Sequence, residues 1–373
     1  MVNILILIFV LLLIGYSISL IYFTYKIDRY DPVRKKDLPF LSIVVSLHNE
    51  ERNVKTLMKS LLQQEYPEEK LEYIFVNDRS KDKTGEMLDK YSVENKYIKV
   101  IHINDIQNGI APKKRAIDSA IKKSIGEVIL LTDADAQHPK KWAKTMGSYF
   151  TEKVGMVLGN VQYKKLSGSN NLLFELLKLD FFTISAIAAS TVSMKYPATC
   201  IGTNMAFRKH VYEQLSGYGK YKNIQSGDDD LFLQRVRDES DWKIEYAIDE
   251  NTKVFTFPPS SWRQFYNQRL RFASKGFKYP FRVTLSLLLL YLFNLSFILL
   301  LLFSFWSHNL FVLLVFGIVI KVIGEHIFLS KVKSKLSSDV NFGIIPIASI
   351  LHIFYVVYFG AATQFQSYEW GSN

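Results

Sequence analysis

The stretch EVILLTDAD, residues 127–135, indicates the fold class of this chain. Its apolar run from Val128 to Leu131 is typical of a buried strand, and Asp133 and Asp135 follow that run. Three similar apolar stretches precede it, each followed by a segment with helical features. This alternation predicts a Rossmann-like, mainly parallel sheet covered by helices. We expect strands at 41–47, 71–78, 97–103 and 127–135, and helices at 49–64, 84–91 and 112–124.

Polar residues follow three of the four predicted strands. Sheets of this kind bind ligands beyond the carboxyl ends of their strands, so these side chains are expected to converge on one edge. Asp and Asn also cap helices and form turns, which is the plain structural alternative for any one of them. The residues are Asn49 and Glu50, Asn77 and Asp78, and Asp133 and Asp135.

The pair Asp133-x-Asp135 suits a particular chemistry. Hard divalent cations take oxygen ligands and usually keep phosphate oxygens in their coordination shell. Two carboxylates at a strand end therefore suit a metal-bridged nucleotide diphosphate. The motif is short and common, and it gains weight from its place after the fourth predicted strand.

Three uncharged apolar stretches are long enough to cross a bilayer, at residues 4–23, 283–306 and 343–367. A weaker fourth stretch at 310–329 contains Lys321, Glu325 and His326, which we expect to face other helices or an interface. The first stretch could instead be a cleaved signal peptide. No Lys or Arg precedes it and its cleavage site is poor, so we favour an uncleaved anchor.

Cations beside the apolar stretches predict the orientation. Lys and Arg residues follow the first stretch and separate the third from the fourth, whereas the turn 307–309 has none. The polar middle of the chain is therefore expected to be cytoplasmic, at the inner cell membrane, with both termini outside. The net charge of +11 is part topology signal and part attraction to anionic lipid. We find no basic stripe with a nucleic-acid motif, and the lone Cys200 excludes an internal disulfide.

The chain resembles the inverting family-two glycosyltransferases of the GT-A fold over about residues 42–276. The resemblance rests on several motifs that are specific in combination. In chain order they are SLHNEE (46–51), VNDRS (76–80), APKKRAI (111–117), TDAD (132–135), GTNMAFRK (202–209), GDDDL (227–231) and QRLRF (268–272).

The resemblance implies roles for the donor-binding residues. Glu50 and Asp78 would hold the nucleoside, usually uridine, and Lys113 would lie near the nucleotide-sugar. Asp133 would serve both sugar and metal, with Asp135 the more direct ligand of Mg²⁺ or Mn²⁺.

Further motifs would supply the reaction and acceptor groups. Asn204 matches a position that lines the sugar or acceptor pocket. Asp228 and Asp229 match an acidic pair whose second member is the catalytic base, and Asp230 would have a structural role at a helix start. Gln268, Arg269 and Arg271 match a Gln-x-x-Arg-Trp motif at the pyrophosphate. Its last residue is Phe272 here, which leaves acceptor stacking and processivity open.

Two further helices border this predicted site. Residues 261–275 are expected to form an amphipathic helix at the membrane interface, with Ser261 and Gln264 as a capping box, or an ordinary helix packed on the domain. Residues 172–194 could be a fifth span. Because Glu175, Lys178 and Asp180 fall in their first half, we expect a core or interface helix.

The predicted organisation has four parts: an N-terminal transmembrane helix at 1–25, a GT-A domain at 38–257, an interface helix at 258–281 and a transmembrane region of about three helices at 282–373. The expected activity is metal-assisted sugar transfer from a nucleotide-sugar to a lipid or lipid-linked glycan. The alternatives are a non-catalytic membrane subunit that binds a nucleotide or partner, and a nucleotidyl or phosphoryl transferase. No GxxxxGK[ST] sequence favours the last of these.

Overall fold

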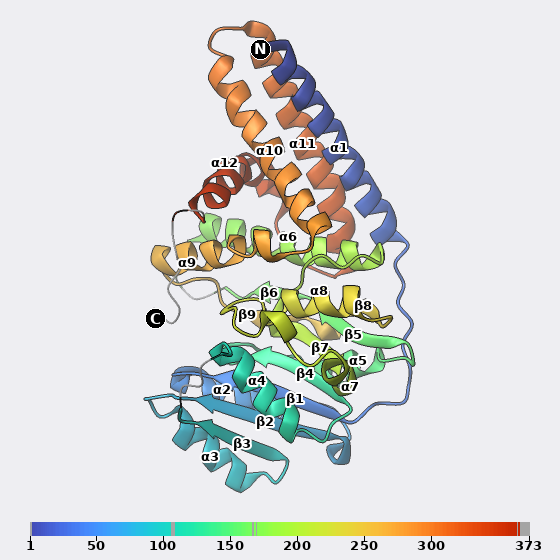
Figure 1. Ribbon diagram of the computed structural model, residues 1–373, viewed down its shortest axis with the longest axis vertical. Coiled ribbons are helices and arrows are strands. Elements are labelled where there is room, and N and C mark those ends of the chain that lie inside the picture. The colour runs from blue at the N-terminus through green and yellow to red at the C-terminus, as the bar shows by residue number, and fades with distance from the viewer. Residues whose placement is uncertain (1, 106–108, 166–167, 169, 364, 366–373) are drawn as a thin grey trace. The chain divides into compact units, whose positions relative to one another are not determined.

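The computed structural model describes residues 2–105, 109–165, 168, 170–363 and 365 (Figure 1). The chain divides into two compact units. We call them the sheet unit, which comprises Tyr30–Ser167 and Ile187–Phe257, and the helical unit, which comprises Met1–Arg29, Gly168–Ala186 and Pro258–Asn373. Residues 168–186, which the sequence places in a domain at 38–257, thus group with the helical unit.

The sheet unit contains a seven-stranded sheet with the order β3-β2-β1-β4-β7-β5-β8. The first four strands are parallel neighbours, and β7 runs antiparallel to both β4 and β5. The mainly parallel sheet and its first four strands are confirmed. The bounds are β1 (Leu41–Leu47), β2 (Leu71–Asp78), β3 (Ile98–Ile103), β4 (Val128–Asp133), β5 (Val154–Gly159), β7 (Met205–Arg208) and β8 (Lys243–Ala247).

Helices and short turns complete the sheet unit. A second, two-stranded parallel sheet pairs β6 (Val161–Tyr163) with β9 (Val254–Thr256). The helices are α2 (Glu51–Leu61), α3 (Thr84–Glu94), α4 (Pro112–Lys123), α5 (Trp142–Ser148), α7 (Lys209–Gln214) and α8 (Asp230–Glu239). Single 3₁₀ turns lie at η1 (Glu68–Lys70), η2 (Gly202–Asn204), η3 (Gly219–Tyr221) and η4 (Glu250–Thr252).

The core of the sheet unit explains why α2 forms where the sequence predicts it. Val54, Leu57, Met58 and Leu61 recur at helical spacing, and all four are buried in one cluster with the side chains of β1. Burial of each side chain is worth roughly 1.5–3 kcal/mol relative to exposure. Packing of this apolar face therefore stabilises an 11-residue helix that would be marginal in isolation.

Four helices of the helical unit are long and apolar enough to cross a membrane, and they confirm the four predicted stretches. Their outward side chains include many exposed Leu, Ile and Phe residues, which fits contact with lipid rather than water. They are α1 (Val2–Asp28), α10 (Phe281–Phe303), α11 (His308–Lys335) and α12 (Ile345–Ala362), which the turn η6 (Phe342–Ile344) precedes.

The ionisable residues of the weakest stretch face neighbouring helices, as expected. The ammonium of Lys321 is 1% exposed and pairs with Glu325 one turn along α11. The hydroxyl of Tyr16 in α1 donates to Glu325 at 2.6 Å, and Ser349 in α12 donates to the other carboxylate oxygen. One carboxylate thus links three helices within the apolar bundle.

Two more helices of the chain meet through an ion pair. Arg269 of α9 (Trp262–Ala273) lies 2.6 Å from the carboxylate of Asp180 in α6 (Asn171–Ser193). Helix α6 is not among the candidate spans, in agreement with its charged first half. The side chain of Ser261 caps α9, while Gln264 reaches back to Ser260, so the capping box is shifted by one residue on that side. The turn η5 (Gly276–Lys278) follows α9.

Candidate active site

The polar strand ends lie side by side, as the sequence predicts. Strand register places Leu47 of β1 beside Asn77 of β2, and Ser46 of β1 beside Asp133 of β4. The loop after β1 is tied to the loop after β2, because the backbone N–H of Glu50 donates to the Thr84 hydroxyl at 2.8 Å. The carboxyl ends of β1, β2 and β4 therefore form one polar edge.

Lys113 joins two of the predicted carboxylates. Its ammonium, at the start of α4, lies 2.9 Å from Oδ1 of Asp133 and 3.0 Å from Oδ2 of Asp228. Burial on its own would lower the pKa of Lys113, but the two carboxylates outweigh burial and raise it. Burial would likewise raise the pKa values of Asp133 and Asp228, whereas Lys113 holds both below their usual range. All three groups are therefore charged at neutral pH.

The turn η2 contacts both the metal-binding motif and the acidic pair. The hydroxyl of Thr203 donates to Oδ2 of Asp133 at 2.5 Å. The backbone N–H of Gly202 donates to Oδ2 of Asp229 at 3.0 Å. A Cβ atom on Gly202 would lie 2.9 Å from the Cβ of Asp229, so the approach requires glycine. Sequence reasoning missed both residues, although they begin the motif that contains Asn204.

Asn204 occupies a different environment from the one expected for a pocket residue. Its side chain is fully buried, its amide group donates to the carbonyls of Asn160 and Thr252, and its Oδ1 accepts from the Trp142 indole. These contacts tie η2 to three separate segments of the sheet unit. In this arrangement Asn204 supports the site from below its surface.

The three consecutive aspartates have three environments. Asp228 pairs with Lys113, while Asp229 is the N-cap of α8 and accepts from the backbone N–H of Asp230 at 2.7 Å. Asp230 is 2% exposed and begins the helix, which fits the structural role expected for it. Asp228 and Asp229 are half-buried, so each retains access to solvent.

Asp78 is held by two guanidinium groups. Nη2 of Arg115 lies 2.7 Å from its Oδ1, and Arg79 forks onto both carboxylate oxygens at 2.9 and 3.1 Å. Arg79 adopts a left-handed backbone conformation with φ of 57°. Arg115 was not predicted, although it lies two residues after Lys113 in the same motif. Near this edge, burial raises the pKa of Glu50, and the charges of Asp135 and Asp133 add to that effect.

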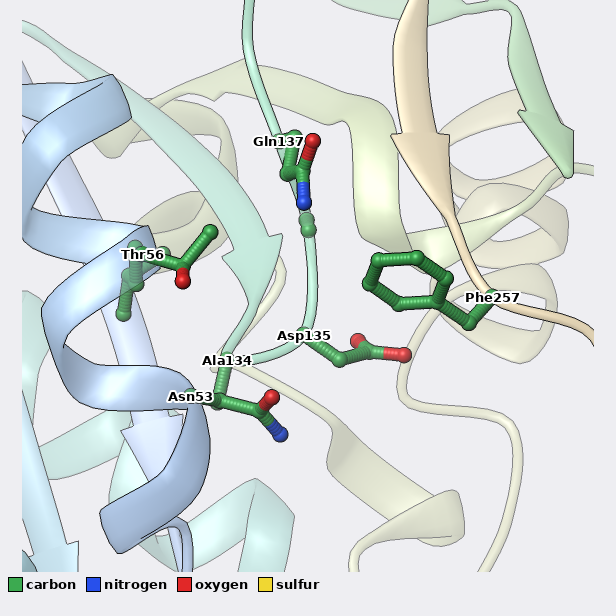
Figure 2. A pocket seen from close by; sticks show the side chains of 8 residues that line it. Asn53, Thr56, Ala134, Asp135, Gln137 and Phe257 are labelled. Atoms are coloured by element: carbon green, nitrogen blue, oxygen red, sulfur yellow. The ribbon is translucent and has the colours of Figure 1, made fainter. Parts of the chain in front are cut away.

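A cavity of about 190 Å³ opens beside Asp135 (Figure 2). Figure 2 shows the Asp135 carboxylate between Asn53 of α2 and the ring of Phe257. Burial raises the pKa of Asp135, and repulsion from Asp133 raises it further. The Thr256 hydroxyl donates to Oδ2 of Asp135 at 2.7 Å. The cavity lining is Asn53, Thr56, Leu57, Ala134, Asp135, Ala136, Gln137 and Phe257.

The residues around Asp135 fit a divalent cation that a substrate helps to hold. Within the described residues, no group of three or more His, Cys, Asp or Glu side chains could hold a metal unaided. Mg²⁺ at phosphate sites, however, commonly uses one or two carboxylates and completes its shell with water and phosphate oxygens. Asp135 is a buried carboxylate repelled by a neighbouring one, and a cation would relieve that repulsion.

The QRLRF motif lies in the helical unit, on α9. Arg269 is 1% exposed, pairs with Asp180 and lies near the ring of Phe265. These contacts fit a residue that joins α6 to α9. Gln268 and Arg271 are half-buried on the same helix, and the guanidinium of Arg271 lies 5.6 Å from the Phe272 ring.

Comparison with known proteins agrees with this geometry. Residues 42–216 match the family described as Glycosyl transferase family 2. The chain therefore carries a glycosyl transferase family 2 domain with a GT-A fold, whose sheet and Asp-x-Asp edge are those described above. A solved structure of similar fold is the mannosyltransferase PcManGT from Pyrobaculum calidifontis in complex with GDP-Man and Mn²⁺. It has a TM-score of 0.62 and 15% identity, over 94% of this chain and 99% of that one.

Similar proteins in sequence include other glycosyltransferases. The probable glycosyltransferase YdaM of Bacillus subtilis is 29% identical over 64% of this chain and 55% of its own length. The beta-monoglucosyldiacylglycerol synthase of Trichormus variabilis is 33% identical over 35% of this chain and 27% of its own length. The matches thus span about half or less of these relatives.

Proposed function

We propose that this protein is a membrane-bound glycosyltransferase that moves a sugar, with inversion, from a nucleotide-sugar to a lipid or lipid-linked glycan. The observation that carries the proposal is the Lys113 bridge between Asp133 and Asp228, with Asp229 held beside it by Gly202. A non-catalytic binding subunit would not need an acidic pair held in this way.

In the proposed reaction the acceptor hydroxyl attacks the anomeric carbon of the donor sugar. Asp229 takes the hydroxyl proton as the new C–O bond forms. The bond from the anomeric carbon to the diphosphate breaks, and its electron pair leaves with the nucleoside diphosphate. Arg271 and Gln268 are proposed to bind the leaving diphosphate, since a guanidinium forks onto phosphate oxygens.

Donor recognition is proposed to rest on the polar edge of the sheet. Glu50 and Asp78 would hold the nucleoside, with UDP the diphosphate carrier that the family resemblance implies, and Lys113 would face the nucleotide-sugar. Mg²⁺ or Mn²⁺, when held by Asp135 and Asp133, would offset the charge of the diphosphate. Arg269, in contrast to Arg271, is proposed to act through its pairing with Asp180.

A lipid acceptor is supported by two features. Four apolar helices keep the protein with membrane lipids, and one group of relatives carries the name beta-monoglucosyldiacylglycerol synthase. The cations that follow α1 and end α11 support a cytoplasmic sheet unit at the inner cell membrane. A cytoplasmic site would meet nucleotide-sugars where they are made.

The test uses the purified full-length chain with a panel of UDP- and GDP-sugars, Mg²⁺ or Mn²⁺, and total membrane lipid. Release of nucleoside diphosphate and a lipid product heavier by one sugar residue are the expected results. Asp229→Asn should keep donor binding and lose transfer. Transfer by Asp229→Asn at the wild-type rate would exclude Asp229 as the base. A product heavier by a phosphate group would instead indicate a phosphoryl transferase.

A further inference from the structure

Lys114, the neighbour of Lys113, is fully buried in the sheet unit. Its ammonium donates to three backbone carbonyls, those of Tyr221 at 2.7 Å, Ile224 at 2.8 Å and Ser226 at 3.1 Å. The ring of Tyr218 lies 5.4 Å from the same nitrogen. An ammonium has three donors, so these carbonyls can use its full hydrogen-bonding capacity.

The three carbonyls belong to the segment 218–227, which leads into Asp228 and Asp229. Only a short turn of regular structure, η3, lies within it, and Lys222, Asn223 and Gln225 are exposed. Such a segment has few apolar contacts that could fix its path. A buried cation that collects its carbonyls supplies the missing constraint.

The first turn of α4 touches this segment at two further points. The backbone N–H of Ala111 donates to the carbonyl of Lys222 at 2.8 Å, and Lys113 pairs with Asp228. Successive residues of a helix point about 100° apart, so Lys113 and Lys114 face different surroundings. Lys113 contacts the carboxylates themselves, while Lys114 contacts the backbone that carries them.

We propose that Lys114 is a positioning residue for sugar transfer, whose buried ammonium fixes segment 218–227 and thereby places Asp228 and Asp229. The proposal rests on the proposed function for its kinetic consequences. Its structural consequence, an ordered segment before the acidic pair, can be measured without any substrate.

The first test compares Lys114→Met with Lys123→Met, a change at an exposed lysine at the end of the same helix. Methionine preserves the length of the side chain but leaves three carbonyls without their donor. We expect kcat to fall about 100-fold, because misplacement of a reacting group by about 1 Å costs that much. The Kd of the donor should stay within about 3-fold, since donor contacts remain. Lys123→Met should match the wild type.

The second test measures amide hydrogen exchange without substrate. In Lys114→Met, amides of residues 218–229 should exchange faster than in the wild type, whereas those of β1 should not change. If no nucleotide-sugar supports transfer by the wild type, the proposed function fails, and this measurement still decides the role of Lys114. Unchanged exchange in segment 218–229 would overturn the proposal.

The third test restores the cation from solution. Lys114→Ala leaves space for a small amine, so ammonium chloride or methylammonium chloride should raise its kcat at least about 10-fold, a gain of about 1.4 kcal/mol in transition-state free energy. Sodium chloride at equal ionic strength should have no such effect. A rescue equal for both salts, or none by either, would contradict a specific ammonium site.

Lys114→Arg covers the case in which the smaller side chains do not fold. It keeps the cation but replaces a point donor with a broad planar fork. We expect a folded protein with retained donor binding, lower kcat and faster exchange at residues 218–229. Wild-type kcat together with wild-type exchange in Lys114→Arg would overturn the proposal.

Discussion

Gly202 and Asp229 approach so closely that a methyl group on Gly202 would lie 2.9 Å from the Cβ of the proposed base. The backbone N–H of Gly202 donates to the same carboxylate at 3.0 Å. The position and orientation of Asp229 thus depend on a residue 27 positions earlier in the chain.

Gly202→Ala should displace the Asp229 side chain. Since real Cβ atoms do not approach that closely, the carboxylate must move and its hydrogen bond must lengthen. We expect kcat to fall about 10- to 100-fold with little change in donor Kd. Gly15→Ala is the matched control, because a Cβ there meets nothing within 4 Å. Equal kcat values for Gly202→Ala and the wild type would argue against Asp229 as the reacting carboxylate.

Thr203→Val should weaken the use of the donor. Valine keeps the shape of threonine but removes the hydroxyl that donates to Asp133 at 2.5 Å. Hydrogen bonds to charged groups contribute about 1.5–3 kcal/mol, so kcat/KM for the donor should fall about 10- to 100-fold. Thr203→Ser retains the donor group and should stay close to the wild type. Indistinguishable kinetics for the valine and serine variants would show that the hydroxyl has no role.

His138 should make the stability of the sheet unit sensitive to mild acid. Burial lowers its pKa to about 3, and Ser60 and Thr132 hydrogen-bond the ring. Below the unfolded pKa of about 6.5 the unfolded chain binds a proton that the folded chain does not. The free energy of unfolding therefore falls as pH decreases, by up to about 1.4 kcal/mol per pH unit.

His138→Gln should remove this dependence between pH 7.5 and pH 5.5. The measurement is the thermal unfolding midpoint of the detergent-solubilised protein at several pH values. His210→Gln, a change at an exposed histidine, serves as the control and should keep the wild-type slope. A slope in His138→Gln equal to that of the wild type would mean that His138 does not cause it.

Lys321→Met should destabilise the helical unit more than a paired change at the same place. The single change leaves the Glu325 carboxylate buried with only the hydroxyls of Tyr16 and Ser349. Removal of one partner from a buried ion pair costs about 3–5 kcal/mol, whereas removal of both charges costs much less. Lys321→Met with Glu325→Gln should therefore have a higher unfolding midpoint than Lys321→Met alone. A midpoint for the double variant below both single variants would contradict this account.

Local patterns were sufficient to predict the first four strands, the helices between them and the four apolar spans. Apolar runs and helical spacing are properties of neighbouring residues, and β1 and β2 match their expected bounds. Strand β7 escaped prediction because it is four residues long and pairs antiparallel with strands distant in the chain.

The candidate site was predicted in part for the same reason. Asp133 and Asp135 follow a recognisable strand, so their position at the sheet edge could be expected. The burial of Asn204 and the pairing of Arg269 with Asp180 depend on segments that meet only in the folded chain. A cation that contacts a phosphate and a cation that contacts a buried carboxylate have the same sequence signature. The contacts of Gly202, Thr203 and Lys114 likewise involve partners 27 to 112 positions away.

The adjacency of Lys113 and Lys114 restricts how this region can evolve. Substitution of either lysine alters one set of contacts, but insertion or deletion of a single residue just before α4 would rotate its first turn by about 100° and exchange the surroundings of the two. Both the carboxylate bridge and the carbonyl cluster would then be lost together. Length variation among relatives should consequently be rare between residues 111 and 115, even where the side chains differ, and domain swaps with a boundary there should not yield active chimeras.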